Sequence, residues 1–90
     1  MAAEEAPSLI RYPSLFPIKV MGINDPALER AVVDIALQFD PDYDRATLQL
    51  RTSSGGKYLG LTLSITATSR EQLDALYGSL SSHPLVKVVL

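Results

Sequence analysis

The sequence predicts an α+β domain in which strand, helix, strand, strand, helix and strand follow one another. Three observations predict this order. Apolar and polar residues alternate over residues 58–68, which is the period of a strand with one buried face. Residues 25–40 and 69–83 carry apolar side chains at helical spacing behind a capping residue. A Ser-Ser-Gly-Gly segment at 53–56 has the composition of a hairpin turn.

Size and composition limit the class of protein. The 90 residues are 47% hydrophobic and 20% charged, which is ordinary for one globular domain. The net charge of −2 gives no global attraction to nucleic acid or acidic lipid. The chain has no cysteine, which excludes disulfides and thiolate chemistry and favours the cytoplasm. No apolar run approaches the roughly 20 residues of a membrane helix, so we expect no membrane insertion.

The N-terminal residues differ in character from the rest. Residues 1–13 hold two prolines and no hydrophobic periodicity. We expect a flexible tail there, because termini without packing contacts are usually mobile. The tail is acidic and has no basic start, so it is not a signal peptide. Residues 14–90 are predicted to form the single domain.

The first strand and first helix are predicted from pattern and capping. Leu15–Ile23 alternates with a period of two, which directs Lys19 and Met21 to the polar face. The helix begins at Asn24 or Asp25, because Asp25-Pro26 combines an N-cap with a first-turn proline. It ends near Asp40, since Pro41 disfavours a helical residue before it. Its apolar stripe consists of Leu28, Val32, Ile35, Ala36 and Phe39.

The second half of the chain is predicted in the same way. Residues 46–53 are expected to form the second strand and residues 58–68 the third. The second helix starts with a capping box, in which Ser69 binds the Gln72 amide and Gln72 reaches back. His83-Pro84 ends this helix. Leu85–Leu90 is the last strand, with Val86, Val88 and Leu90 directed inward if Lys87 faces water.

This element order is the split β-α-β pattern of ferredoxin-like domains. Right-handed crossovers give a four-stranded antiparallel sheet with strand order 4-1-3-2. Each helix has one apolar stripe, so both helices are expected on one sheet face, as a two-layer sandwich. Strand parity leaves these residues on the open face: Lys19, Met21, Thr47, Gln49, Arg51, Tyr58, Gly60, Thr62, Ser64, Thr66, Lys87 and Val89.

No catalytic or metal-binding motif is complete. Asp40, Asp42 and Asp44 have the spacing of calcium ligands, but Arg45 and Arg51 stand where such a loop needs glycine and glutamate. Gly55-Gly56-Lys57 resembles part of a phosphate-binding loop, but a strand follows it instead of a helix. His83 has no nucleophile or carboxylate partner by motif. We therefore expect no enzyme activity, no cofactor and no metal.

Two regions are candidate binding sites. Gly22, Ile23, Asn24 and Asp25 join a strand end to a capped helix start, where backbone amides can bind a carboxylate or phosphate. A tight turn that needs glycine explains the same segment. Lys19, Met21, Arg51, Tyr58 and Lys87 form a candidate interaction face.

The candidate interaction face admits several partners. Tyr58 can stack on an RNA base, although three basic residues among threonines also make an ordinary soluble sheet face. We expect nucleic acid to be the less favoured partner. A second copy of the chain could also pair there, through Met21, Tyr58 and Val89, because edge strands need to be paired or covered.

Several segments together resemble the YbeD-like family of small bacterial proteins over residues 12–90. They are Phe16-Pro17-Ile18-Lys19-Val20-Met21-Gly22, Ser53-Ser54-x-Gly56-x-Tyr58, Ile65-x-Ala67 with Gln72, Tyr77-x-x-Leu80 and Val86-x-x-Val89-Leu90. The resemblance implies a ferredoxin-like fold similar to ACT domains, which bind amino acids and regulate enzymes. It also implies a link to lipoate or amino-acid metabolism.

Two functions follow as hypotheses. The first is a non-enzymatic regulatory or ligand-sensing module, self-associating, with a small carboxylate or amino-acid ligand at Gly22–Asp25. The second is a protein-interaction adaptor that uses the open sheet face or an edge strand. RNA binding is a third and weaker alternative.

Overall fold

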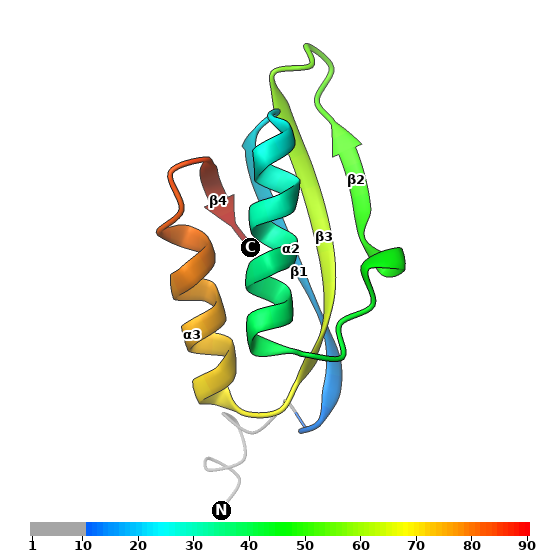
Figure 1. Ribbon diagram of the computed structural model, residues 1–90, viewed down its shortest axis with the longest axis vertical. Coiled ribbons are helices and arrows are strands. Elements are labelled where there is room, and N and C mark those ends of the chain that lie inside the picture. Colours follow the sequence, from blue (N-terminus) through cyan, green and yellow to red (C-terminus); the bar gives the residue numbers. More distant parts are fainter. Residues whose placement is uncertain (1–10) are drawn as a thin grey trace, which may run out of the picture.

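Two helices cover one face of a four-stranded sheet in the computed structural model, which describes residues 11–90 (Figure 1). Residues 1–10 of the predicted tail lie outside the described residues. The elements are β1 (Ser14–Ile23), α2 (Pro26–Phe39), a short 3₁₀ turn (Arg45–Thr47), β2 (Gln49–Thr52), β3 (Tyr58–Ala67), α3 (Arg70–Ser81) and β4 (Val86–Val89).

The sheet has the topology that the sequence predicts. Its strands lie in the order β2-β3-β1-β4, which is the expected 4-1-3-2 order from the opposite edge. Every neighbouring pair is antiparallel. Both helices lie on the same side of the sheet (Figure 1). The ferredoxin-like α+β fold is therefore confirmed.

The core lies between the sheet and the two helices. Every second residue of β3 is buried, and the inward residues of β1 alternate in the same way. The alternation leaves one apolar face per central strand, and each helix contributes one stripe to it. The core includes Ile18, Val20, Leu28, Val32, Ala36, Leu61, Leu63, Ile65, Leu73, Leu76 and Leu80.

Both helices begin at the predicted caps. The Asp25 carboxylate accepts the Ala27 amide at 2.8 Å, and Ser69 Oγ accepts the Gln72 amide at 3.0 Å. These bonds satisfy backbone donors that the first turn of a helix leaves unpaired. α2 ends at Phe39, and Asp40 is its C-terminal cap. The first helix therefore has the start and end that the sequence predicts.

The side chain of Gln72 differs from the capping-box prediction. Its Oε1 accepts the Thr68 amide at 2.7 Å and not the Ser69 amide. Its Nε2 donates to Phe39 O at 2.9 Å and to Thr66 O at 3.1 Å. One side chain thus joins the end of α2, the end of β3 and the start of α3. Short-range capping rules do not predict the contact with Phe39, which lies 33 residues away.

The predicted second strand is shorter than expected. Asp44 caps a 3₁₀ turn over Arg45–Thr47, since its carboxylate accepts the Ala46 amide and its carbonyl accepts the Thr47 hydroxyl. β2 therefore begins only at Gln49. The expectation that Thr47 belongs to the second strand is wrong, because an aspartate that binds its own backbone competes with strand pairing. Thr47 nevertheless lines a depression with Ser64 and Thr66 of β3.

β1 and β4 come unusually close at Gly22. A Cβ atom on Gly22 would lie 2.2 Å from the Leu85 carbonyl oxygen and 3.0 Å from Leu28 Cδ2. The neighbouring Ile23 amide donates to that carbonyl at 3.0 Å. Gly22 is therefore required by close packing of two strands and a helix.

A β-bulge in β4 lies beside this contact. Gly22 pairs with Val86, but the adjacent Met21 pairs with Val88, so Lys87 is an extra residue on β4. A bulge of this kind reverses the alternation of the side chains that follow it. Val88 is consequently opposite outward-facing Met21, and Val89 packs against the core. The predictions that Val88 and Leu90 face inward and that Val89 faces outward are wrong for this reason.

We predict that Gly22→Ala destabilises the domain and that Gly60→Ala does not. A methyl group on Gly22 collides with backbone, and overpacking costs about 1–3 kcal/mol or more. A methyl group on Gly60 would meet only the Arg51 carbonyl oxygen, at an ordinary 3.5 Å. Urea unfolding of both variants measures the difference. Equal loss of stability in the two variants would contradict the role of the Gly22 contact.

Candidate functional site

Strand register places eight residues in two rows across the face that the helices leave open. Val88, Met21, Gly60 and Arg51 form one row across β4, β1, β3 and β2. Leu90, Lys19, Thr62 and Gln49 form the next row. We call these eight residues the open-face patch. Lys19 and Leu90 exchange two backbone hydrogen bonds, of 3.1 and 2.7 Å, which fixes their position as a facing pair.

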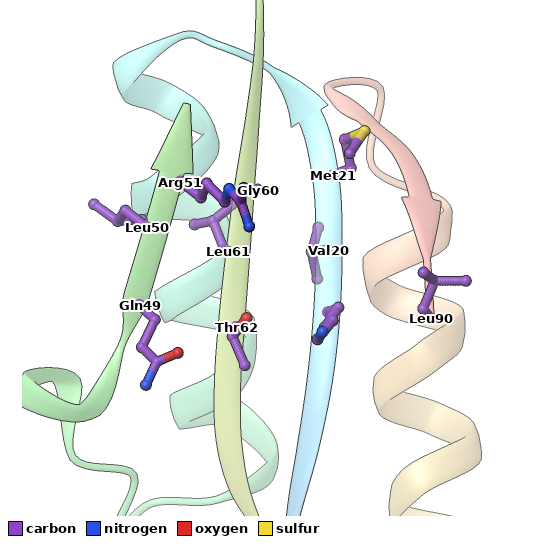
Figure 2. Close-up of a pocket in the computed structure, with 10 residues that line it drawn as sticks. Val20, Met21, Gln49, Leu50, Arg51, Gly60, Leu61, Thr62 and Leu90 are labelled. Atoms are coloured by element: carbon purple, nitrogen blue, oxygen red, sulfur yellow. The ribbon is translucent and has the colours of Figure 1, made fainter. Parts of the chain in front are cut away.

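A shallow depression occupies the middle of the open-face patch (Figure 2). It has a volume of about 440 Å³, and its side walls come from all four strands or their ends. A second depression of about 150 Å³ adjoins it and is lined by Tyr58, Ser53 and Thr52. Met21, Gly60 and Arg51 line both depressions. Gly60 has no side chain, and this leaves space where the two depressions meet.

Exposed apolar side chains gather on the β4 side of the patch. Met21 and Val88 are 46% and 45% exposed, and Leu90 is 74% exposed. Met21 and Val88 form a cross-strand pair. Apolar side chains grouped on a surface mark interaction sites more often than single exposed ones do. The bulge creates this group, since a regular β4 would direct Val88 and Leu90 into the core.

The charges of the strands are all positive. The four strands contain Lys19, Arg51 and Lys87 but no aspartate or glutamate. Within residues 11–90, Arg45 pairs with Glu29 at 3.6 Å and Arg70 pairs with Asp74 at 3.9 Å. Neither Lys19 nor Arg51 has an ion pair in this part of the chain. The sheet therefore presents cations without carboxylates beside them.

The predicted interaction residues are brought together only in part. Lys19, Met21 and Arg51 lie in the open-face patch. Tyr58 lies beside it, is half-buried, and has Lys57 Nζ at 5.6 Å from its ring centroid. This distance fits a cation–π contact, which occupies one face of the ring. Lys87 is the bulge residue at the edge of the sheet.

The predicted ligand site at Gly22–Asp25 is a closed turn. The Ile23 amide donates to Leu85 O, the Asn24 amide to Lys57 O at 3.0 Å, and the Asp25 amide to Ile23 O at 2.8 Å. The Asn24 side chain also donates to Gly56 O at 2.9 Å. An anion at this turn would have to displace hydrogen bonds that the chain already makes. The turn braces the β2–β3 hairpin against the start of α2.

The acidic loop at the opposite end of the sheet is also internally bonded. The Asp40 carboxylate is buried and accepts the Asp42 amide at 3.2 Å and the Thr66 amide at 3.0 Å. In residues 11–90 no group of three side chains could hold a metal ion. Burial raises the pKa of the Tyr43 phenol in this loop, and burial also raises the pKa of Tyr77. Asp42 and Asp44 line a depression there with Ser64 and Thr66.

The single histidine is part of a turn. His83 Nδ1 accepts the Leu85 amide at 3.1 Å, just after the end of α3. This bond occupies one ring nitrogen and orients the entry into β4. No helix in residues 11–90 has the length and apolarity needed to cross a membrane.

The sequence placed Gly60, Thr62 and Gln49 on the open face but did not single them out as site residues, and it directed Val88 and Leu90 inward. A glycine in the middle of an alternating strand is a signal that could have identified Gly60. Val88 and Leu90 depend on the bulge, for which the six residues of the last strand carry no local signal. Their position follows from the contact of Gly22 with Leu85, which joins distant parts of the chain.

Comparisons with known proteins identify close relatives. Residues 7–90 match the family described as "Protein of unknown function (DUF493)". A UPF0250 protein from Leptothrix cholodnii is 59% identical over 83 residues, which are 92% of this chain and 91% of the relative. One from Bordetella pertussis is 55% identical with the same coverage.

A solved structure supports the fold. The solution structure of protein HP0495 from H. pylori superposes with a TM-score of 0.68 at 16% identity. The match covers 100% of this chain and 94% of that one. At this identity the likeness concerns the fold alone.

We predict that glycine and acetate leave the amide signals of Ile23, Asn24 and Asp25 unchanged. The three amides already donate within the chain, and exchanging such bonds for a ligand gains little free energy. Titration of the isotope-labelled protein, followed by ¹H–¹⁵N correlation spectra, measures this. Saturable shifts confined to these residues would instead support the ligand-sensing hypothesis.

Proposed function

We propose that this chain, which belongs to the DUF493 family of small bacterial proteins, is a non-enzymatic adaptor that binds a protein through its open-face patch. Its membership confirms the family predicted from the sequence. The observation that carries the proposal is the grouping of Met21, Val88 and Leu90, all well exposed, in one patch with Arg51.

The composition of the patch supports a protein partner. Methionine and arginine are enriched in protein interfaces, whereas most other charged residues are depleted there. Met21, Val88 and Leu90 make the β4 side of the patch apolar, and Lys19, Thr62, Gln49 and Arg51 make the rest polar. Protein interfaces commonly combine an apolar group with polar residues around it.

The other hypotheses have less support. The amides of the Gly22–Asp25 turn are already used, so ligand sensing there lacks free donors. Within residues 11–90 His83 and the buried Asp40 bind backbone amides and do not form a catalytic set with a nucleophile, which is why we propose a non-enzymatic adaptor. The resemblance suggests that the partner belongs to lipoate or amino-acid metabolism, in the cytoplasm. The identity of captured proteins tests that suggestion.

We predict that Met21→Gln lowers recovery of the partner about fivefold or more, because it removes an apolar contact from the centre of the patch. Leu37→Gln is the matched control, since Leu37 on α2 is 40% exposed and lies outside the patch. The full chain carries its affinity tag at the N-terminus, because Leu90 belongs to the patch. Quantitative mass spectrometry compares proteins captured from bacterial lysate.

The two variants decide the proposal together. Thermal unfolding establishes that both remain folded. The adaptor proposal predicts proteins that the wild type and Leu37→Gln recover equally and Met21→Gln loses. If no captured protein depends on Met21, the open face is not the binding surface.

A further inference from the structure

We propose that the partner presents an acidic segment, with one carboxylate seated in the depression over Gly60 against the Arg51 guanidinium. This inference rests on the proposed function and adds the chemistry of the partner. Charge, the position of Arg51 and the presence of glycine at position 60 each support it.

Charge separates the two layers of the molecule. The strands carry three cations and no acid. The helices α2 and α3 together carry four acids, Glu29, Asp34, Glu71 and Asp74, against the two cations Arg30 and Arg70. Lys19 and Arg51 have no ion pair with any residue from 11 to 90. Opposite charges across an interface favour encounter and exclude partners with the same charge. The open face therefore suits a negatively charged surface.

Arg51 is placed to bind a carboxylate. Its side chain extends from β2 towards β3 and lies beside Gly60, at the depression (Figure 2). The guanidinium group has a planar set of donors that matches the two oxygens of a carboxylate. Lys19, one row away on β1, supplies a second cation at the same depression.

Gly60 keeps the depression open although the fold does not need glycine there. Its pairing with Met21 and Arg51 is regular, its φ is not in the left-handed region, and an added Cβ would have only ordinary contact. Glycine inside a strand weakens the strand and often marks a place where another group comes close. Such a group has space here, because Gly60 lines both depressions of the face.

A second copy of the chain fits this surface poorly. A two-fold contact between open faces would bring together two sets of strands that both carry cations, and neither set has a carboxylate to pair with Lys19 and Arg51. Nucleic acid also fits poorly, since Asp42 and Asp44 line a depression with Ser64 and Thr66 of the same sheet. A phosphate backbone that ran along the sheet would carry its charges past those carboxylates, whereas one carboxylate at Gly60 lies in a separate depression. Tyr58, the aromatic residue of this area, already contacts Lys57.

Two pairs of variants test the carboxylate site in the capture experiment. Arg51→Gln removes the proposed carboxylate partner, and Arg30→Gln removes an exposed cation from α2 as its control. Gly60→Val fills the depression, and Thr66→Val adds no volume on the same strand outside the open-face patch. We expect Arg51→Gln and Gly60→Val to lower partner recovery about tenfold. The thermal midpoint of Gly60→Val is expected to be unchanged or raised, because valine favours strands.

Carbodiimide cross-linking identifies the chemistry directly. This reagent joins an amine to a carboxylate with no spacer, so a bond between Lys19 and the partner shows an aspartate or glutamate at the patch. Lys19→Arg keeps the charge, so it is expected to retain the partner and lose that cross-link. Mass spectrometry locates both ends of the bond.

The outcomes separate the two proposals. If Met21→Gln loses the partner but Arg51→Gln and Gly60→Val retain it, the adaptor function stands and the carboxylate site is wrong. If none of the variants changes recovery, both proposals fail. Recovery abolished by nuclease, or Lys19 cross-linked only to another copy of this chain, also overturns the acidic partner.

Discussion

The contact between Gly22 and the Leu85 carbonyl determines how β4 joins the sheet. The oxygen lies 2.2 Å from the position that a side chain would take, so the two strands can meet only at glycine. Leu28 of α2 packs against the same point. The bulge at Lys87 lies next to this contact, and it turns Val88 outward while Val89 packs on the core. The exposure of Val88 and Leu90 on the open face is thus associated with a backbone contact on the core side of the sheet.

The opposite end of the sheet is fastened by side chains and not by a close backbone contact. Gln72 binds the ends of α2 and β3 together with the start of α3. The buried carboxylate of Asp40 accepts the amide of Thr66 on β3. Hydrogen bonds to buried charged groups are among the stronger ones in proteins. Because contacts fix the sheet at the Gly22 end and at the Asp40 end, the central strands hold the residues of the open-face patch in defined positions.

Local pattern was sufficient to predict the elements, the strand order and the layer of each helix. The alternation in β1 and β3 and the caps at Asp25 and Ser69 depend on residues close in sequence, and the structure confirms them. The errors arise where distant contacts override local pattern. Lys87 becomes an extra residue because of Gly22, and Gln72 reaches Phe39 across 33 residues. Strand parity correctly places Lys19, Met21 and Arg51 on one face of the sheet. It cannot place Val88 and Leu90, because the bulge reverses the alternation in β4.

The separation of charge between the two layers also affects how the molecule moves in an electric field. Cations lie in the strands, and the helices carry an excess of carboxylates, so the domain has a dipole that runs across its thin dimension. A charged body nearby would therefore rotate the molecule before any contact forms. The extent of this rotation depends on distance, because counter-ions at physiological salt screen such a field beyond about 8 Å. The domain is thus oriented only when a negative surface is within about this distance, and the sheet and not the helices would then face that surface.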